Sequence, residues 1–398
     1  FKDKKVDFCY LSYGINGLIK GKYSPDKVIV LYKKLIKLKL DREYLMYSNW
    51  KIRYFIETQT IDLEIVEHIC NIAKNYPIKE QDLNPNHLLS DGINSVRGSA
   101  VDVLLNLYKH KEYKDLVFST IEEVIENCNL SIKVTIISRI AFLNYLNTSQ
   151  AFSIFKKLVS TKNTDILKHS INSGQYYNNS FHEEMEDYIV ALMENEETQQ
   201  TNYILVNSYL EGKIYGKKYY KDFIAKGKSA ILCALKVAEE FLFYKGRLNN
   251  KAITMLYEFL NSDDIEIARE YEAIILRKFK NGEFLELYDF MLAYSKSKVC
   301  KRAPHYFLDY LILHSKDYPN ECLKLIENID FSRNPNIQES GYYDKEPIQL
   351  VLGIYSKLIL PLKKDKEKIE KCLDIFDGML THSHLRNNAI RAIELMSE

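Results

Sequence analysis

A phosphate-binding loop is the first chemistry that the residue types suggest. Gly227, Lys228 and Ser229 precede a predicted helix, as at the end of a loop whose backbone amides and helix start cradle phosphates. That motif needs an earlier glycine at position 222, which is Asp, and no apolar strand precedes it. We therefore expect an ordinary helix start and no nucleotide hydrolysis.

Histidines occur at two places in the sequence with spacings close to those of metal ligands. His182 and Glu183 begin the pattern of a zinc-protease helix, but the second ligand position holds Glu186 where a histidine is needed. An acidic first helical turn is expected there instead. His382 and His384 lie two residues apart with no cysteine or third ligand nearby. We predict a surface turn at these two histidines and no metal site at either place.

Asp102, Glu112 and Lys114 follow the linear order of a metal-dependent nuclease core. In such a core two carboxylates hold Mg²⁺ and a lysine steadies the attacking water. That core presents its carboxylates from strands, whereas these residues fall on helical patterns with a turn between them. The sequence also has no GxSxG segment and no cysteine in a recognisable nucleophile setting. We expect a chain that binds and is not an enzyme, with no cofactor.

The elements that carry these residues are predicted to be helices throughout. Apolar residues recur at the i, i+3, i+4, i+7 spacing of amphipathic helices, and no stretch alternates with period two for long enough to form a strand. The expected helices span residues 26–40, 60–75, 94–109, 112–127, 131–146, 149–160, 181–194, 199–210, 228–244, 248–261, 263–278, 282–296, 302–315, 318–329, 345–364, 367–381 and 385–397.

The connections between these helices are short, with capping sequences such as Ser24-Pro25-Asp26 and stops such as Asn281-Gly282. Helices joined by short turns pack as antiparallel hairpins, and hairpins without a sheet to cover stack on one another. The predicted fold class is all-α, an α-solenoid of stacked helical hairpins similar to TPR or HEAT repeats. We expect one continuous array over residues 1–398, with irregular stretches and subdivisions near 77–93, 171–180 and 331–346.

Charge and hydropathy argue against two classes of partner, nucleic acid and membranes. The 55 basic and 54 acidic side chains leave a net charge of +1, so we expect no basic surface for nucleic acid. No apolar run approaches the roughly 20 residues that a membrane span requires, and we expect neither a membrane span nor a signal peptide. Because the sequence begins with Phe1 in place of Met, we expect a fragment of a longer chain.

Cysteine usage indicates the cytoplasm. The cysteines are scattered singly, without a CxxC pair, and they fall mostly inside apolar helical patterns, as expected of reduced core thiols. They are Cys9, Cys70, Cys128, Cys233, Cys300, Cys322 and Cys372.

A short pattern occurs twice in the chain and points to HEAT-like repeats. It reads Val96-Arg97-x-x-Ala100-x-x-x-Leu104 and then Leu385-Arg386-x-x-Ala389-x-x-x-Ile393, with a looser copy at Ala268-Arg269. In the second helix of such repeats a small Ala allows close helix approach and the Arg bonds toward a neighbouring turn. We expect Arg97 to bond carbonyls or an acid of the adjoining helix, while Gly98 and Ala100 allow tight packing. Ligand contact by Arg97 is the alternative.

Two segments resemble parts of a known family. The first, Gly92-Ile93-Asn94-Ser95-Val96-Arg97-Gly98-Ser99-Ala100, opens a helix after a loop that contains Pro and Asn. It resembles a signature of the C-terminal repeat regions of antiviral STAND NTPases, the Avs or AVAST group of bacterial anti-phage proteins. Residues 372–380 are similar to a recurring element near their C-termini. The motif residues are Asn94, Arg97, Gly98 and Ala100.

The resemblance implies a sensor. In that family an N-terminal effector, often a nuclease, precedes a P-loop NTPase core and a long helical sensor that grips a conserved phage protein. The NTPase motifs are absent from this sequence, which agrees with a sensor segment. The resemblance therefore implies that the chain binds a large terminase subunit or a portal, and that binding triggers homo-oligomeric assembly of the full-length protein.

Tyrosines are the predicted contact residues, because tyrosine supplies a large contact area at a small entropic cost. The sequence has 30 tyrosines, and a bias of the genome toward A and T would also explain this number, because tyrosine codons are AT-rich. Two other functions stay open: a generic helical-repeat scaffold for protein complexes, and a nucleic-acid-binding repeat protein or nuclease, which the balanced charge disfavours. The predicted anchors are Tyr176, Tyr177, Tyr219, Tyr220, Tyr342 and Tyr343.

Overall fold

The computed structural model divides the chain into two compact units, Phe1–Ile204 and Leu205–Glu398. It describes residues 14, 17–18, 21, 24–37, 46, 49–50, 52–53, 56, 61–77, 85–199, 201–244, 247–329, 331, 346–359, 365–382 and 385–391.

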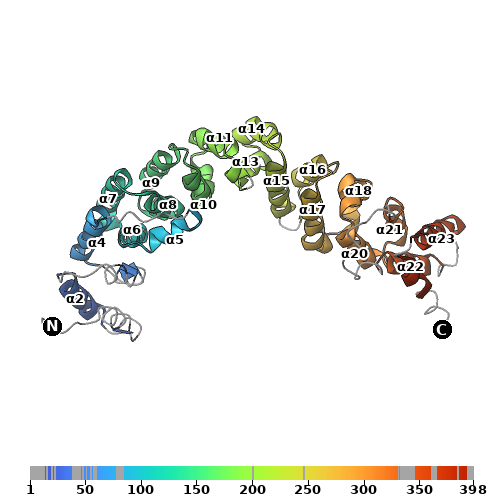
Figure 1. Ribbon diagram of the computed structural model, residues 1–398, viewed down its shortest axis with the longest axis horizontal. Helices are drawn as coiled ribbons and strands as arrows, with labels where there is room; N and C mark the ends of the chain where they lie inside the picture. The colour runs from blue at the N-terminus through green and yellow to red at the C-terminus, as the bar shows by residue number, and fades with distance from the viewer. Residues whose placement is uncertain are drawn as a thin grey trace. The chain divides into compact units, whose positions relative to one another are not determined.

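The fold of the described residues is all-α, with the arrangement of a helical-repeat protein (Figure 1). The one exception among them is a two-residue hairpin, in which β1 (Phe243–Tyr244) pairs antiparallel with β2 (Arg247–Leu248). This agrees with the predicted fold class and with the prediction of negligible strand content. Among the described helices, none combines the length and apolar character needed to cross a membrane.

The helices of the first unit form two rows. In one row α4, α7 and α9 pack each on the next, and in the other α6, α8 and α10 do so. Helix α4 also packs on α6, and α5 lies against α6 and α8. The α-helices of this unit whose bounds fall among the described residues are α2 (Pro25–Ile36), α4 (Leu63–Asn75), α5 (Leu88–Ile93), α6 (Val96–Leu105), α7 (Lys114–Glu126), α8 (Leu130–Arg139), α9 (Asn144–Val159), α10 (Thr164–Ser180), α11 (Glu186–Glu194) and α12 (Glu196–Gln199). Its 3-10 turns are η1 (Pro85–His87), η2 (Leu107–Lys109), η3 (Lys111–Tyr113), η4 (Ile140–Leu143) and η5 (His182–Glu184).

The second unit repeats the two-row arrangement more regularly. Figure 1 shows α15, α17, α20 and α22 along one row and α16, α18, α21 and α23 along the other, and each helix packs on the next in its row. The division between the units falls inside α13 (Tyr203–Leu210). The other helices are α14 (Ile214–Ile224), α15 (Lys228–Phe241), α16 (Asn250–Glu258), α17 (Ile265–Arg277), η6 (Phe279–Asn281), α18 (Phe284–Ser295), α19 (Lys298–Arg302), α20 (His305–His314), α21 (Pro319–Ile326), α22 (Glu346–Ile359) and α23 (Lys366–Leu380).

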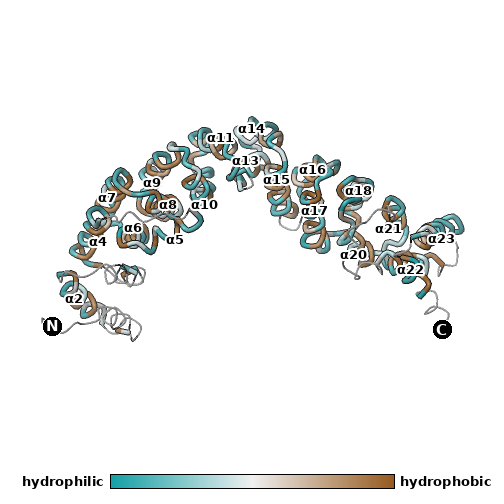
Figure 2. Tube along the Cα trace, viewed as in Figure 1, coloured by the Kyte–Doolittle hydropathy of each residue, from teal (hydrophilic) through white to brown (hydrophobic). Residues whose placement is uncertain are grey.

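Side-chain caps and apolar stripes explain why these segments are helical. Ser95 Oγ accepts a hydrogen bond from Gly98 N at 2.9 Å at the start of α6, and Asp264 caps α17 in the same way. Each cap satisfies an amide that the helix itself leaves unpaired. In Figure 2 many helices are hydrophobic where they meet neighbouring helices and hydrophilic elsewhere. Burial of these stripes between the rows holds each unit together.

Residues 171–180, predicted to be an irregular stretch, are instead the second half of α10. Asn, Ser and Gly are weak helix formers, which explains the prediction. Here Ser173, Gly174 and Tyr177 are buried, and a Cβ at position 174 would meet the Tyr188 ring. Packing against neighbouring helices therefore overrides the local propensity.

Further helices lie where none was predicted, the short α12 and α19 among them. Leu88–Ile93 forms α5 inside the expected irregular stretch 77–93, and Ile214–Ile224 forms α14. Helix α14 has few apolar residues, but Tyr220 and Phe223 are buried, and a Cβ at Gly216 would overlap the backbone of Tyr209. A close approach between α13 and α14 therefore stabilises a segment with a weak apolar pattern. Most of the expected stretch 331–346 lies outside the described residues.

Candidate functional site

The residues that resemble a phosphate-binding loop form a simple helix start. Gly227 caps α15 with a φ of +100°, a backbone conformation that favours glycine. Lys228 Nζ lies 2.9 Å from Glu266 Oε1 in α17, so this cation is paired with a neighbouring helix. The preceding element is helix α14 and not the strand that a phosphate-binding loop follows.

The zinc-protease pattern is split between two elements. His182 and Glu183 lie in η5, whereas Glu186 begins α11, and His182 Nδ1 is 2.9 Å from Asn178 Oδ1. Within the part of the chain that the structure describes, no three His, Cys, Asp or Glu side chains are grouped to hold a metal ion. Position 384 lies outside that part.

Asp102 is a buried structural anion. Its carboxylate is 1% exposed and forms ion pairs with Arg53, at 2.7 Å, and with Arg139 at the end of α8. Glu112 lies instead 3.4 Å from His110 Nδ1. Asp102 and Glu112, the two carboxylates of the nuclease-like pattern, thus have different partners. The Asp102 ion pair with Arg139 joins α6 to α8.

The structure corrects two of the predicted tyrosine anchors. Tyr177 is fully buried, with its ring against Phe152 and Phe155, and Tyr220 is 3% exposed and stacks on Tyr209 at a ring distance of 3.8 Å. Both side chains belong to the core because they lie on the inner face of their helices. Neither side chain is exposed for contact with a partner.

Of the other predicted anchors, Tyr176 is 49% exposed on α10. Tyr219 is half-buried on α14, with Lys218 Nζ 4.8 Å from the ring centroid. Tyr342 and Tyr343 lie outside the described residues. Since Tyr176 and Tyr219 belong to different units, no single unit brings the described candidates together.

Three of the four motif residues, Arg97, Gly98 and Ala100, lie in the packed centre of the first unit, whereas Asn94 is exposed. Arg97 is 6% exposed; its Nε donates to Ala73 O in α4 at 2.7 Å and its Nη1 to Asn127 O, after α7, at 3.2 Å. Gly98 and Ala100 are buried in α6. These contacts are of the kind expected for an arginine between stacked helices. Burial lowers the pKa of the Arg97 guanidinium, which still remains charged at neutral pH.

An exposed aromatic cluster that the sequence analysis missed lies on the first unit. Tyr108, in η2, has its ring centroid 6.1 Å from Phe142, in η4, and 5.5 Å from Tyr145, in α9. Phe142 is 43% and Tyr145 70% exposed, and Lys109 Nζ lies 5.5 Å from the Tyr108 ring centroid. The only signal in the sequence is that these aromatic residues fall near the ends of two predicted helices, 94–109 and 131–146. Their meeting depends on tertiary packing.

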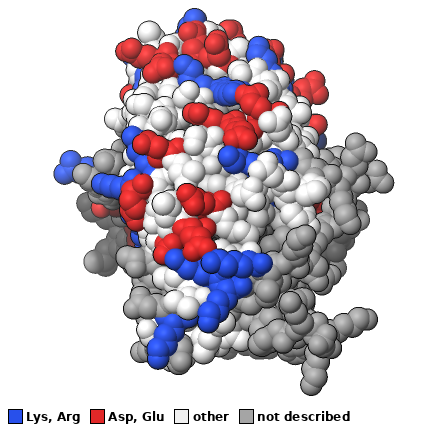
Figure 3. All heavy atoms as spheres, turned by 90° about the vertical axis from the view of Figure 1, so that its left-hand side faces the viewer, with Lys and Arg blue, Asp and Glu red and all other residues white. Residues whose placement is uncertain are grey.

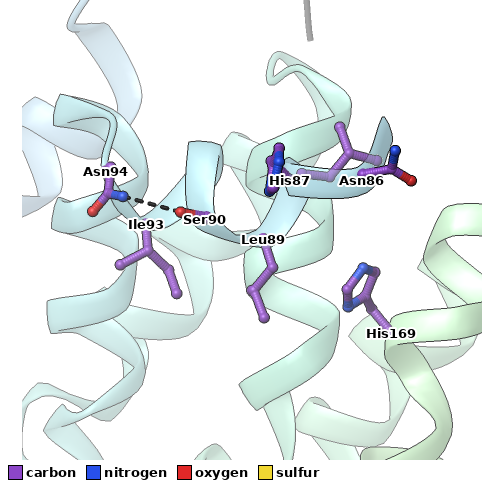
Figure 4. A pocket seen from close by; sticks show the side chains of 8 residues that line it. Asn86, His87, Leu89, Ser90, Ile93, Asn94 and His169 are labelled. Carbon is purple, nitrogen blue, oxygen red and sulfur yellow. Dashed lines mark hydrogen bonds between the residues drawn. The ribbon is translucent and has the colours of Figure 1, made fainter. Parts of the chain in front are cut away.

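A pocket of about 440 Å³ lies between α5 and α10 of the same unit. Figure 4 shows Leu89 and Ile93 projecting from one side of α5, and His169 pointing from α10 toward Leu89. Burial lowers the pKa of His169, so its imidazole is neutral at neutral pH. Two lining residues, Ile93 and Asn94, belong to the motif segment 92–100. The lining residues are Asn86, His87, Leu88, Leu89, Ser90, Ile93, Asn94 and His169.

Acidic and basic side chains are interspersed on the described surface that Figure 3 shows, and neither sign covers the whole face. This distribution agrees with the net charge of +1. A scan of the sequence against protein-family models found no match. Searches of curated proteins and of solved structures found none either.

Proposed function

We propose that this chain is a protein-recognition module, the sensor part of a bacterial anti-phage STAND NTPase, and that it binds a large terminase subunit or a portal. The observation that carries recognition is the exposed aromatic cluster of Tyr108, Phe142 and Tyr145 on a stack of helices. Exposed aromatic residues held by a rigid scaffold are frequent anchors of protein interfaces. The phage ligand and the assembly step rest on the resemblance of residues 92–100.

The aromatic cluster has the properties of an anchor site. The Tyr108 ring contacts both of the other rings, so part of the ordering cost of an interface is met before a partner binds. Tyr108 and Tyr145 combine a large apolar area with a hydroxyl group that can pair at a wet interface. The neighbouring Lys109 favours a partner with acidic groups beside its apolar contact.

The test is a binding measurement between the purified chain and a panel of large terminase subunits and portals. We expect one of them to form a stable complex, and the double variant Phe142→Ala/Tyr145→Ala to bind it at least about 30-fold more weakly, or about 2 kcal/mol, as for interface hot spots. Tyr176→Ala removes an exposed tyrosine elsewhere on this unit and serves as the matched control.

Three outcomes of these measurements distinguish between the possible contact sites and functions. Loss of binding in the double variant with an unchanged melting temperature supports the cluster as the contact. Loss on Tyr176→Ala alone would move the contact to α10. If no terminase or portal binds, and capture from phage-infected cells returns no phage protein, the sensor function is wrong and a generic helical-repeat scaffold replaces it.

A further inference from the structure

The pocket between α5 and α10 has an apolar floor and a polar rim. Leu88 is buried, and Leu89 and Ile93 are half-buried, four residues apart on one face of α5. Asn86 and Ser90 are exposed at the rim. A volume of about 440 Å³ falls in the range of roughly 300 to 1,000 Å³ typical of ligand pockets. The space can therefore hold a large side chain together with part of its main chain.

The charge of the lining narrows the class of ligand. None of the eight lining residues is Asp, Glu, Lys or Arg. A charged group that entered this pocket would lose water without gaining an ionic partner, and that desolvation is costly. An uncharged ligand is thus favoured.

The rim is suited to a peptide backbone. Asn and Ser side chains offer both hydrogen-bond donors and acceptors, as the N–H and C=O groups of a peptide require. Asn94 Nδ2 donates to Ser90 Oγ at 3.2 Å, as Figure 4 shows, and this bond fixes the carboxamide of one lining residue relative to the hydroxyl of another. His169 adds an imidazole on the opposite wall.

We propose that this pocket binds an uncharged, apolar side chain, of leucine or phenylalanine type, in an extended segment of a protein partner, with the partner's backbone paired by Asn94 and its neighbours on the rim. The proposal rests on the proposed function, because it supplies a second contact of the same recognition module. It adds a site of defined chemistry to the aromatic cluster, whose contacts are broad and depend on shape.

The experiment is a titration of the whole chain, labelled at its Ile and Leu methyl groups, with blocked amino acids followed by NMR. The probes are the N-acetyl N-methylamides of leucine and phenylalanine, which carry an apolar side chain between two peptide groups. Those of glutamate and lysine are the charged controls. We expect saturable shifts of the Leu89 and Ile93 methyl signals with the apolar probes, and at least about tenfold weaker binding of the charged probes.

Two pocket variants and one control variant separate binding from folding. Leu89→Asn should abolish the shift of the Ile93 methyl signal, whereas the control Leu373→Asn, at a leucine that is 44% exposed on α23, should leave both shifts unchanged. Because Leu89 is half-buried, Ser90→Trp gives a second variant that fills the mouth of the pocket from an exposed position. Its methyl spectrum outside the pocket should match that of the parent chain.

The proposal is wrong if the apolar probes shift neither methyl signal, or if the charged probes bind equally well. It is also wrong if Ser90→Trp leaves the affinity unchanged. No phage protein is used in this titration. A negative titration with a positive terminase or portal complex would therefore reject the pocket alone, and the reverse result would reject the phage ligand alone.

Discussion

Arg97 places a guanidinium group where two helices end. Its hydrogen bonds reach the carbonyl oxygens of Ala73, in the last turn of α4, and of Asn127, directly after α7. The last carbonyls of a helix have no hydrogen-bond partner within it and carry a partial negative charge. The buried guanidinium therefore supplies hydrogen-bond donors and a favourable charge to the carbonyl groups at both helix ends. Arg386, at the matching position of the second copy, donates to Leu380 O at the end of α23 in the same manner but is exposed.

Replacing Arg97 tests this packing role. We expect Arg97→Ala to lower the free energy of unfolding by about 2 to 4 kcal/mol, because it leaves the buried Ala73 carbonyl and the part-buried Asn127 carbonyl without their charged donor. Arg386→Ala is the matched control and should cost less than about 1 kcal/mol, since water can replace an exposed donor. Chemical denaturation monitored by circular dichroism measures both. An Arg97→Ala chain that melts like the parent yet fails to bind its partner would show that Arg97 acts in recognition.

The tyrosine pairs show how far residue-level prediction can go. Consecutive residues in a helix point about 100° apart, so two adjacent tyrosines seldom share a face. In each described pair the second tyrosine is buried, Tyr177 and Tyr220, while Tyr176 and Tyr219 are more exposed. Helical periodicity applied to these pairs could have predicted that one member of each is in the core. The cluster around Tyr145 could not be found in this way, because its members come from three separate elements.

At the scale of elements, close helix contact depends on glycine in the motif segment. A Cβ at position 98 would overlap Gly92 O, and a Cβ at position 92 would overlap Thr135 Oγ1 and Ser131 O in α8. These contacts join α5, α6 and α8 with almost no side chain between them. The pocket depends on them, since they hold α5 against the rest of the unit.

Gly98→Ala should therefore destabilise the chain although alanine favours a helix. We expect a loss of about 2 to 3 kcal/mol in the free energy of unfolding, in the upper part of the range that is usual for overpacking a core. Gly378→Ala is the control: its Cβ would meet nothing within 4 Å, so the change should be neutral or stabilising by up to about 1 kcal/mol. Equal effects of the two substitutions on thermal unfolding would contradict the close approach of α5 and α6.

The prediction of elements succeeded where the apolar pattern is strong and failed where packing supplies the stability. Helix α17 (Ile265–Arg277) was expected at 263–278, because its stripe and its Asp264 cap are both visible in the sequence. Helices α10 and α14 bury tyrosine and glycine among polar residues, and such faces become apparent only when their neighbours are known. The motif segment was found from its pattern, but the pocket beside it depends on α10.

On the scale of the whole chain, the described cysteines are distributed over both units and none of them is in a disulfide. All are buried except Cys128, which is intermediate. Burial raises the pKa of Cys128 and Cys372 to about 11 and that of Cys322 to about 12. A raised pKa keeps a thiol protonated at pH 8, and the thiolate is the reactive form.

We expect these thiols to resist modification as long as the chain is folded. In a Cys9→Ser background, which removes the cysteine outside the described residues, an aromatic disulfide reagent at pH 8 should show no fast phase. In guanidinium chloride all the remaining thiols should react. Fast labelling of one cysteine under native conditions, located by mass spectrometry, would show that its helix opens or that its surroundings differ from those described.

The two-row arrangement of the second unit also has a consequence for how the chain folds. Contacts such as α15 with α17 and α16 with α18 join segments that are near neighbours in the sequence. Short loops cost little entropy to close, and proteins dominated by local contacts fold faster than those that must first bring distant strands together. A helix pair can therefore settle on its predecessor as soon as it leaves the ribosome, without waiting for the rest of the chain to be synthesised.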